Sequence, residues 1–367
     1  MAFQRYRFTP SADAEFVKTL KARVDQYFKN NDITRHANAQ MVVKTIAVFT
    51  MALAPLIIML TGVITNIGLL FALWIIMGVG MAAIGTNVMH DALHGSYSRN
   101  PKVNKWIGQS IRFLGASGHM WTIQHNVLHH SFTNMEHADE DIDAPSILRF
   151  SPHQPLKKIH RYQFIYAWFL YGLSTLLWTT IKDFNAVNRY RKMGLLNSGK
   201  DFRKAFTDIV VWKIIYYVYL LVLPLIFIPA PWWAIVMMYI TMHFVMGFLL
   251  SVVFQAAHVV PETEFTSVED GNAMKRSWHV HQLLTTANFA TGSKVVTWFT
   301  GALNYQIEHH LFPNICHVHY PRIAPIVRET AREFQIPYHN KSNFWSAVRA
   351  HARMLRDLGK SNQQAAA

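Results

Sequence analysis

The stretch HNVLHH, residues 125–130, decides how this chain folds, because it places three imidazoles within six residues. Two similar clusters flank it: HDALH at residues 90–94 and QIEHH at residues 306–310. On a helix, histidines four residues apart stand on one face, one turn from each other. Neutral imidazole is the commonest metal ligand, and such pairs are how helices present it. Three clusters in one chain therefore predict metal binding.

The composition around these clusters predicts a membrane protein. The chain has 367 residues, of which 51% are hydrophobic, and the apolar residues arrive in long blocks. The formal net charge of +14 suits a protein that faces anionic lipid. No recognisable nucleic-acid-binding motif accompanies this charge, so we expect no nucleic-acid partner. Cys316 is the only cysteine, which rules out an intrachain disulfide.

Four apolar blocks are long enough to cross a bilayer, which takes roughly 20 helical residues. They are residues 41–62, 67–89, 209–228 and 232–254. Short uncharged links join them in pairs, which predicts two hairpins. A fifth block, residues 162–181, has basic loops on both sides, so we expect it to lie in the membrane interface. Four crossings leave all three histidine clusters on one side, whereas a fifth would separate the third cluster from the others.

The expected fold is therefore an all-α integral membrane protein. It has four transmembrane helices in two hairpins and a helical cytosolic cap that holds the histidines. Residues 1–40 form an amphipathic cytosolic segment, in which Phe16, Leu20, Val24 and Phe28 recur every four residues. This face packs against the cap or lies on the membrane surface, and packing against the cap is favoured. The membrane domain spans residues 41–355, and residues 356–367 form a C-terminal tail. Both termini and the metal site are expected on the cytosolic face of this multi-pass protein.

Adjacent histidines indicate which metal chemistry to expect. A haem with two histidine ligands takes one imidazole per side, and neighbours on a helix point about 100° apart. Pairs such as His129 and His130 fit two metal ions better, with one imidazole for each. The candidate ligands also exceed the three or so that zinc hydrolases use. A site rich in imidazole and without cysteine suits iron as well as zinc.

The order HDxxH, HxxxHH and QxxHH, together with two spanning hairpins, resembles the membrane fatty-acid desaturases. The glutamine of the third box and the following LFP at residues 311–313 are similar to the front-end branch, which includes linoleoyl-CoA-type desaturases. The resemblance covers about residues 40 to 355. Front-end enzymes often carry a fused cytochrome b5 domain with an HPGG motif. That motif is absent here, so we expect electrons to come from a separate donor: ferredoxin, cytochrome b5 or a flavoprotein reductase.

The resemblance implies a non-haem centre of two iron ions that uses O2 and two electrons. It would remove hydrogen from two adjacent CH2 groups and leave a cis double bond in a long-chain acyl-CoA or acyl-lipid. Acids and bases have no hold on unactivated C–H bonds, so a redox metal must carry this reaction. Carried over by position, the implied metal ligands are His90, His94, His125, His129, His130, His258, His309 and His310.

The third box departs from ordinary acyl-CoA desaturases, which have a histidine where this chain has Gln306. Gln306 would bind metal through its amide oxygen, orient a water, or be replaced by His281. Asp91, Glu308 and Asp143 are candidates to orient ligand imidazoles by accepting their second N–H. Asp143 belongs to an acidic run over residues 136–143 that is also readable as a solvated loop.

Two further histidines are of interest outside the boxes. His243 falls within an apolar block, where polar groups are often functional. It would either line an acyl tunnel or make an interhelical hydrogen bond. His351 lies in a polar, basic stretch and is expected to be solvated.

Two other functions compete with desaturation. The same metal scaffold serves membrane hydroxylases and ketolases, and the product, alkene or alcohol, discriminates between them. A histidine-rich metal transporter is the rival from another class. Transporters place ionisable ligands near the bilayer midplane, whereas these boxes sit at helix ends. The basic cytosolic surface favours an anionic head such as CoA and an acidic electron carrier. Double-bond position, chain length and oligomeric state are not readable from the sequence.

Overall fold

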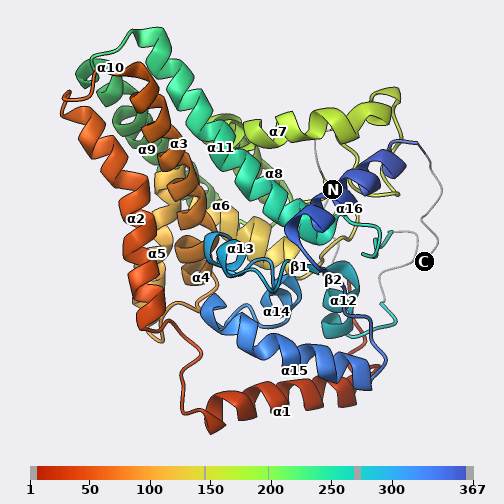
Figure 1. The fold of residues 1–367 in the computed structure, drawn as a ribbon. Helices are drawn as coiled ribbons and strands as arrows, with labels where there is room; N and C mark the ends of the chain where they lie inside the picture. The colour runs from red at the N-terminus through yellow and green to blue at the C-terminus, as the bar shows by residue number, and fades with distance from the viewer. Residues whose placement is uncertain (1–5, 144–145, 197, 268–273, 361–367) are drawn as a thin grey trace.

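The computed structural model describes residues 6–143, 146–196, 198–267 and 274–360, and these residues are mostly helical, with turns and loops between the helices (Figure 1). The exception among them is a pair of two-residue strands, β1 (Asn288–Phe289) and β2 (Asn340–Lys341), which run parallel to each other. The predicted helical class is therefore confirmed.

Within the described residues, five helical stretches are long and apolar enough to cross a membrane. They are Ala39–Leu60, Ile67–Leu93, Lys158–Lys192, Gly199–Phe227 and Trp232–His258. The sequence predicted four, with residues 162–181 in the interface, and length and composition do not confirm a count of four. The helix that contains the predicted span at residues 209–228 begins earlier, at Gly199, where Ser198 caps it by accepting a hydrogen bond from Asp201 N. The last stretch also runs past the predicted end at residue 254 to include His258.

Helices α2 (Ala39–Leu60), α3 (Ile67–Ala83) and α11 (Trp232–His258) run side by side in Figure 1. Glycine lets their backbones meet: a Cβ on Gly80 would lie 2.5 Å from the backbone nitrogen of Ala52, and one on Gly78 would lie 2.7 Å from the carbonyl oxygen of Met242. Small residues at such crossings are the usual packing device of membrane helices. The long helix η4–α7–η5–α8 lies across this bundle instead of along it (Figure 1). Its parts are η4 (Lys158–Tyr162), α7 (Gln163–Leu177), η5 (Trp178–Lys182) and α8 (Asp183–Lys192).

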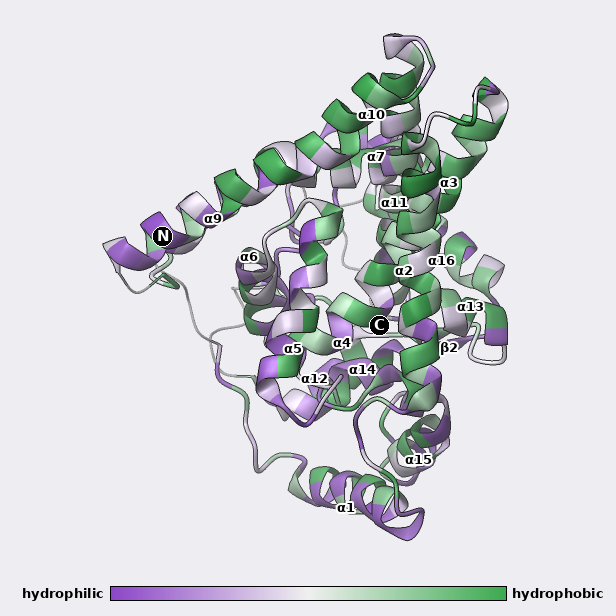
Figure 2. Ribbon diagram, turned by 90° about the vertical axis from the view of Figure 1, so that its left-hand side faces the viewer, coloured by the Kyte–Doolittle hydropathy of each residue, from purple (hydrophilic) through white to green (hydrophobic). Residues whose placement is uncertain are grey.

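Hydropathy divides the molecule into two levels. The upper part of the bundle in Figure 2 is almost wholly hydrophobic, whereas the helices below it are mixed. On α2, Val43 and Ile57 are 66% and 63% exposed, as expected of side chains that face lipid. Helix α9 (Gly199–Tyr217), continued by η6 (Val218–Val222) and α10 (Leu223–Phe227), leads obliquely from a hydrophilic outer end into the hydrophobic level.

The amphipathic N-terminal segment packs against the helices of mixed hydropathy that lie below the bundle. Helix α1 (Ala14–Asn30) buries the predicted face, and its Phe16 ring meets Phe334 edge-on at 5.6 Å. Arg23 pairs with Glu333 at the end of α15 (Tyr320–Glu333) at 2.8 Å. The prediction of packing against the cap is confirmed.

Shorter elements connect the bundle to this level. They are η1 (Ile84–Met89), α4 (His90–Leu93), α5 (Pro101–Gly108), η2 (Gln109–Leu114), α6 (Gly118–Thr122), η3 (Ile123–His129), α12 (Trp278–Thr285), α13 (Lys294–Phe299), α14 (Gln306–Leu311), η8 (His317–His319) and α16 (Phe344–Leu358). Helix α16 continues past residue 356, where the tail was expected to begin, and residues 361–367 of that tail lie outside the described residues.

Candidate metal centre

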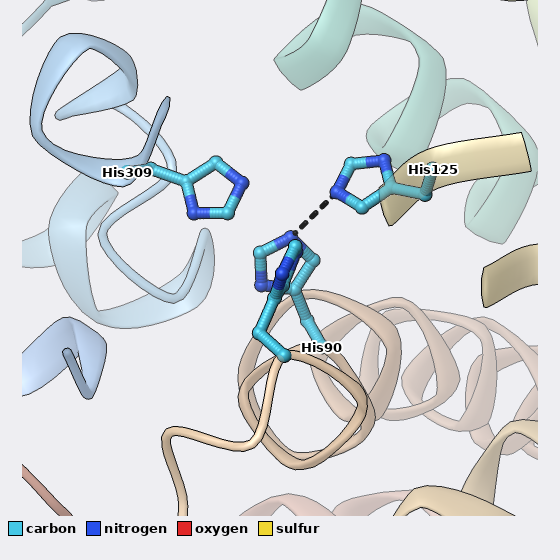
Figure 3. Close-up of side chains that lie close together, drawn as sticks. His90, His125 and His309 are labelled. Atoms are coloured by element: carbon cyan, nitrogen blue, oxygen red, sulfur yellow. Dashed lines mark hydrogen bonds between the residues drawn. The ribbon is translucent and has the colours of Figure 1, made fainter. Parts of the chain in front are cut away.

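The eight predicted histidines come together from four places in the chain. One pair lies where α3 ends through η1 and α4, three histidines lie at the end of η3, one lies at the last residue of α11, and one pair lies on α14. Figure 3 shows His90, His125 and His309 pointing toward one another from three of these elements. The Nε2 atoms of His90 and His125 are 3.2 Å apart.

The central box is wound differently from the prediction, which assumed an α-helix with His125 and His129 one turn apart. Segment η3 is a π-helix, in which His130 N donates to the His125 carbonyl five residues back at 2.9 Å. A π turn widens the helix by one residue, and such turns often occur at functional sites. It brings the Nε2 atoms of His130 and His125 within 3.2 Å of each other. The first box keeps the predicted α-type spacing, with His94 N bonded to the His90 carbonyl.

The histidines form two groups of potential ligand atoms. In the first, nitrogens of His90, His94, His125 and His309 lie within 4.8 Å of one another. In the second, the same holds for His129, His258 and His310. His130 lies between the groups, with its Nε2 2.9 Å from that of His309.

Gln306 lies beside the second group. Its amide nitrogen lies 2.9 Å from His258 Nε2 and 3.4 Å from His310 Nε2, while its amide oxygen has no partner among the described residues. The two ends of an amide are interchangeable by a flip, so the oxygen can occupy the position facing these imidazoles. His281, the predicted substitute, is excluded from the group because its Nε2 donates to the Thr133 carbonyl at 2.8 Å.

The buried imidazoles favour the neutral form. Burial lowers the pKa of His125, His130, His309 and His310 well below the ordinary value, and positive charge on neighbouring histidines would lower it further. The pKa of His94 is lowered for the same two reasons. Neutral imidazole is the form that binds metal.

Asp139 fixes the orientation of His129. Its two carboxylate oxygens lie 3.0 and 3.1 Å from His129 Nδ1, and a carboxylate oxygen of Asp141 lies 3.4 Å from the same atom. Burial alone would lower the pKa of His129, but the two carboxylates outweigh it and raise the pKa to about 9. With Nδ1 donating to Asp139, His129 Nε2 is left without a partner and is free to face a metal.

The three acidic residues predicted to orient ligand imidazoles, Asp91, Glu308 and Asp143, make no hydrogen bond to a histidine of the two groups in the described chain. No hydrogen bond joins the side chain of Asp143 to a histidine of the two groups in the described chain, and Asp139 takes that role. Asp91 Oδ2 accepts from His317 Nδ1 at 2.8 Å, and its other oxygen lies 3.9 Å from His90 Nδ1, beyond hydrogen-bond reach. Glu308 accepts from Asn288 and Tyr338, which fixes the backbone of the third box. Burial raises the pKa of Glu308 to about 7.

Sequence reasoning missed Gln282 of α12. Its amide oxygen lies 2.7 Å from His310 Nδ1 and also accepts from the Thr133 hydroxyl at 2.9 Å. Gln282 therefore fixes the orientation of the His310 ring, as Asp139 fixes that of the His129 ring. Nothing near residue 282 signals this, because the contact depends on how α12 packs against α14.

Two other histidines prove to be structural. His243 Nδ1 donates to Thr175 Oγ1 at 3.1 Å, because the Thr175 hydroxyl already donates to the His243 carbonyl. His243 Nε2 then accepts from Tyr216 at 2.7 Å, so of the two predicted roles the interhelical hydrogen bond is present. The prediction that His351 is solvated is wrong: it is 1% exposed and bonds to Tyr171 and to the Val259 carbonyl.

The residues present fit a pair of metal ions. His94 Nε2, His129 Nε2 and Gln306 Oε1 are buried atoms without a hydrogen-bond partner in the part of the chain that the structure describes. An orphaned buried polar atom is costly unless something binds it. The donor atoms are nitrogen and oxygen, which suit iron among other transition metals.

A cavity of about 500 Å³ leads away from the first group. His90, His125 and Trp121 line one end, and the Trp121 ring stacks on His125 at 4.4 Å. The walls are mostly apolar: Leu170, Leu173 and Leu176 come from α7, Leu250 and Phe254 from α11, and Leu148 and Phe150 from the segment before η4. A few polar side chains also line it, among them Gln124, Glu140, Asp141 and Lys182. The shape and chemistry suit a hydrocarbon chain that passes the metal centre.

Comparison with known proteins gives consistent relatives. The sequence model of the fatty acid desaturase family matches residues 66–342. The chain is 36% identical to "Acyl-lipid (8-3)-desaturase" of Physcomitrium patens over 354 residues, 95% of this chain and 73% of that protein. It is 33% identical to "sn-1 linoleoyl-lipid 6-desaturase" of Synechocystis over 367 residues, 98% of this chain and 99% of that protein. It is also 32% identical to "Delta(5) fatty acid desaturase A" of Dictyostelium discoideum, over 98% of this chain and 77% of that protein.

Proposed function

Because the chain belongs to the fatty acid desaturase family and is a fatty acyl desaturase of its front-end, acyl-lipid type, we propose that it introduces a cis double bond into the acyl chain of a membrane glycerolipid. The balanced reaction takes an acyl CH2–CH2 unit, O2, two electrons and two protons, and gives a CH=CH unit and two waters. The observation that carries this proposal is the apolar cavity that opens at His90 and His125 of the histidine cluster. The acyl-lipid relatives support lipid over CoA as the carrier.

Two iron ions would be held by the histidine groups. His90, His94, His125 and His309 would hold one, and His129, His258, His310 and the Gln306 amide oxygen would hold the other. His130 would serve whichever ion its nitrogen reaches between the groups. Bound there, the iron pair supplies the activation of O2 that removal of hydrogen from an unactivated CH2 requires.

The protein's own residues position the parts. Asp139 and Gln282 hold the rings of His129 and His310 in one tautomer, with Nε2 toward the centre. The leucines and phenylalanines of the cavity bind the chain and exclude water from the reacting carbons. Trp121, stacked on His125, lines the cavity beside the histidines.

We also propose the topology predicted from charge. The membrane domain comprises residues 41–355 with four crossings, and Lys158–Lys192 lies in the interface. Two features support this: the long helix lies across the α2–α3–α11 bundle, and basic residues occur at both of its ends (Figure 1). Both termini and the metal centre would then face the cytosol, where a separate electron donor (ferredoxin, cytochrome b5 or a flavoprotein reductase) reaches them.

The test is the fatty-acid profile of cells that express the chain, beside the double variant His309→Ala, His310→Ala. We expect a new unsaturated acid only with the intact chain, and about two iron ions per purified chain. A hydroxylated product would replace the desaturase proposal with a hydroxylase. If no product forms when reductase and donor are supplied to membranes, desaturation is ruled out and the transporter becomes the better reading.

A further inference from the structure

A second cavity, of about 590 Å³, lies apart from the metal centre. It is enclosed by α2, by α5 with η2, and by α9. None of its lining residues belongs to the histidine groups or to the substrate cavity. Its volume falls within the range of about 300–1,000 Å³ that small-molecule sites occupy.

The walls of this cavity are apolar and reach the lipid-facing surface. Phe49 of α2, Ile107 of α5 and Ile215 of α9 line it. Ile215 is 42% exposed and Trp106, at the rim, is 79% exposed. Exposed tryptophan is typical of the membrane–water interface. An occupant would therefore enter from the bilayer and would be an extended hydrocarbon.

The polar end of the cavity offers hydrogen-bond donors. Ser110 is 6% exposed and its Oγ has no partner, and Arg112 Nε is likewise buried and without a partner in the described chain. Both residues line the cavity. Leaving these donors unpaired is unfavourable, so the occupant should bring an acceptor oxygen.

The charge balance at the polar end of the second cavity favours an occupant with an uncharged polar group. Arg112 Nη2 is bound to Asp208 Oδ1 at 2.8 Å, and its guanidinium lies 4.1 Å above the Trp212 ring. Because Asp208 already balances the guanidinium, a carboxylate or phosphate at this place would meet little net positive charge. An ester carbonyl accepts from Ser110 and Arg112 without adding a charge.

We propose that this cavity is a second lipid site, which binds one ester-linked acyl chain of a bilayer glycerolipid with its ester oxygen at Ser110 and Arg112. The site is separate from the desaturation reaction but connected to it. Tyr216 lines the second cavity and donates to His243, and His243 donates to Thr175, which lines the substrate cavity. An occupant that moves Tyr216 therefore acts on a wall of the substrate cavity through two hydrogen bonds.

The experiment uses the full chain in nanodiscs of phosphatidylcholine that carry a small share of phosphatidylcholine with a photoreactive diazirine on one acyl chain. After irradiation, mass spectrometry maps the labelled peptides. We expect label concentrated on segments 106–113 and 212–219, above the level on Phe169, which is 59% exposed to lipid on α7. Ile107→Trp, which fills the cavity, should reduce this label to the level at Phe169. Ser110→Ala should reduce the label on these segments by up to about fivefold, the loss of one hydrogen bond.

Val103→Trp is the matched control, since Val103 lies on the same helix, is 37% exposed and does not line the cavity. It should leave the label unchanged, and a thermal melt of each variant shows that it is folded. Equal labelling in Ile107→Trp and the parent would attribute the label to bulk lipid and overturn the proposal. Labelling by a diazirine fatty acid but not by the phosphatidylcholine would overturn the glycerolipid assignment. The assay needs no turnover, so its failure is distinct from a failure of the desaturase proposal.

Discussion

Asp139 is the single carboxylate on which the second histidine group most depends. It is fully buried and holds His129 by two short contacts. Asp139→Asn keeps the volume but removes the charge that favours Nδ1 donation, so His129 would lose its fixed tautomer. We expect roughly 10–100-fold weaker iron binding, the usual cost of losing such a partner, measured as iron per chain after dialysis against a graded chelator.

Asp143→Asn is the control for this prediction, since it makes the same change four residues away in the same acidic run. It should keep the iron content of the parent. Equal iron loss in both variants would mean that the charge of the whole run matters and not the contact with His129.

Gln306→Leu tests whether the amide takes part in the second group. Leucine has a similar volume but no donor or acceptor, and it would stand beside His258 and His310. We expect iron to fall from about two ions per chain toward one, because only the first group keeps its ligand set. Gln306→His, which supplies an imidazole at the same place, should restore the second ion. Full iron in the leucine variant would show that Gln306 only fills space.

At the scale of elements, the substrate cavity exists because α7 crosses α11 closely at one point and leaves room beside it. A Cβ on Gly172 would lie 2.2 Å from the Phe244 ring, so glycine allows the two helices to approach closely.

Leu173→Trp would put a large ring into the cavity and shorten the space for the acyl chain. We expect activity on long chains to fall while shorter chains are still desaturated, measured by competition between substrates of different length. Phe169→Trp, on the lipid-facing side of α7, should leave the preference unchanged.

Some structural elements could be predicted from the sequence, whereas others depend on contacts between distant segments. The amphipathic pattern of α1 and the long apolar blocks are local properties, and the structure agrees with both. The π turn of η3 was not predictable, because its extra residue is decided by how His125 and His130 meet the rest of the cluster. Gln282 and the choice of Asp139 among five acidic residues likewise depend on contacts between distant segments. The cavities depend on helix crossings that no residue pattern encodes.

At the scale of the whole molecule, topology is the open prediction. If Lys158–Lys192 lies in the interface, its two ends face the same side, whereas a crossing would separate them. Lys157→Cys and Lys192→Cys place exposed thiols at the ends, and Val63→Cys places one at the opposite turn, where Val63 is 75% exposed. We expect an impermeant maleimide to label the first two from the cytosolic side and the third from the other. Labelling of residues 157 and 192 from opposite sides would establish five crossings.

Cys316 makes this measurement clean, because the chain's own thiol is buried and contributes little background. Its Sγ donates to Asp91 at 3.0 Å, in the network that also holds His317. The parent chain therefore serves as the unlabelled reference for all three variants.

Because the histidines lie far apart in the sequence, the histidine groups can form only late in the synthesis of the chain. His90 and His310 lie 220 positions apart (310 − 90), and the first histidine group contains members from both ends of that interval. At about 5–20 residues per second, the ribosome needs roughly 10–40 seconds to make the intervening chain. Until then each histidine group lacks part of its set of potential ligands. We therefore expect iron to bind only after α11 has entered the membrane and α14 has left the ribosome.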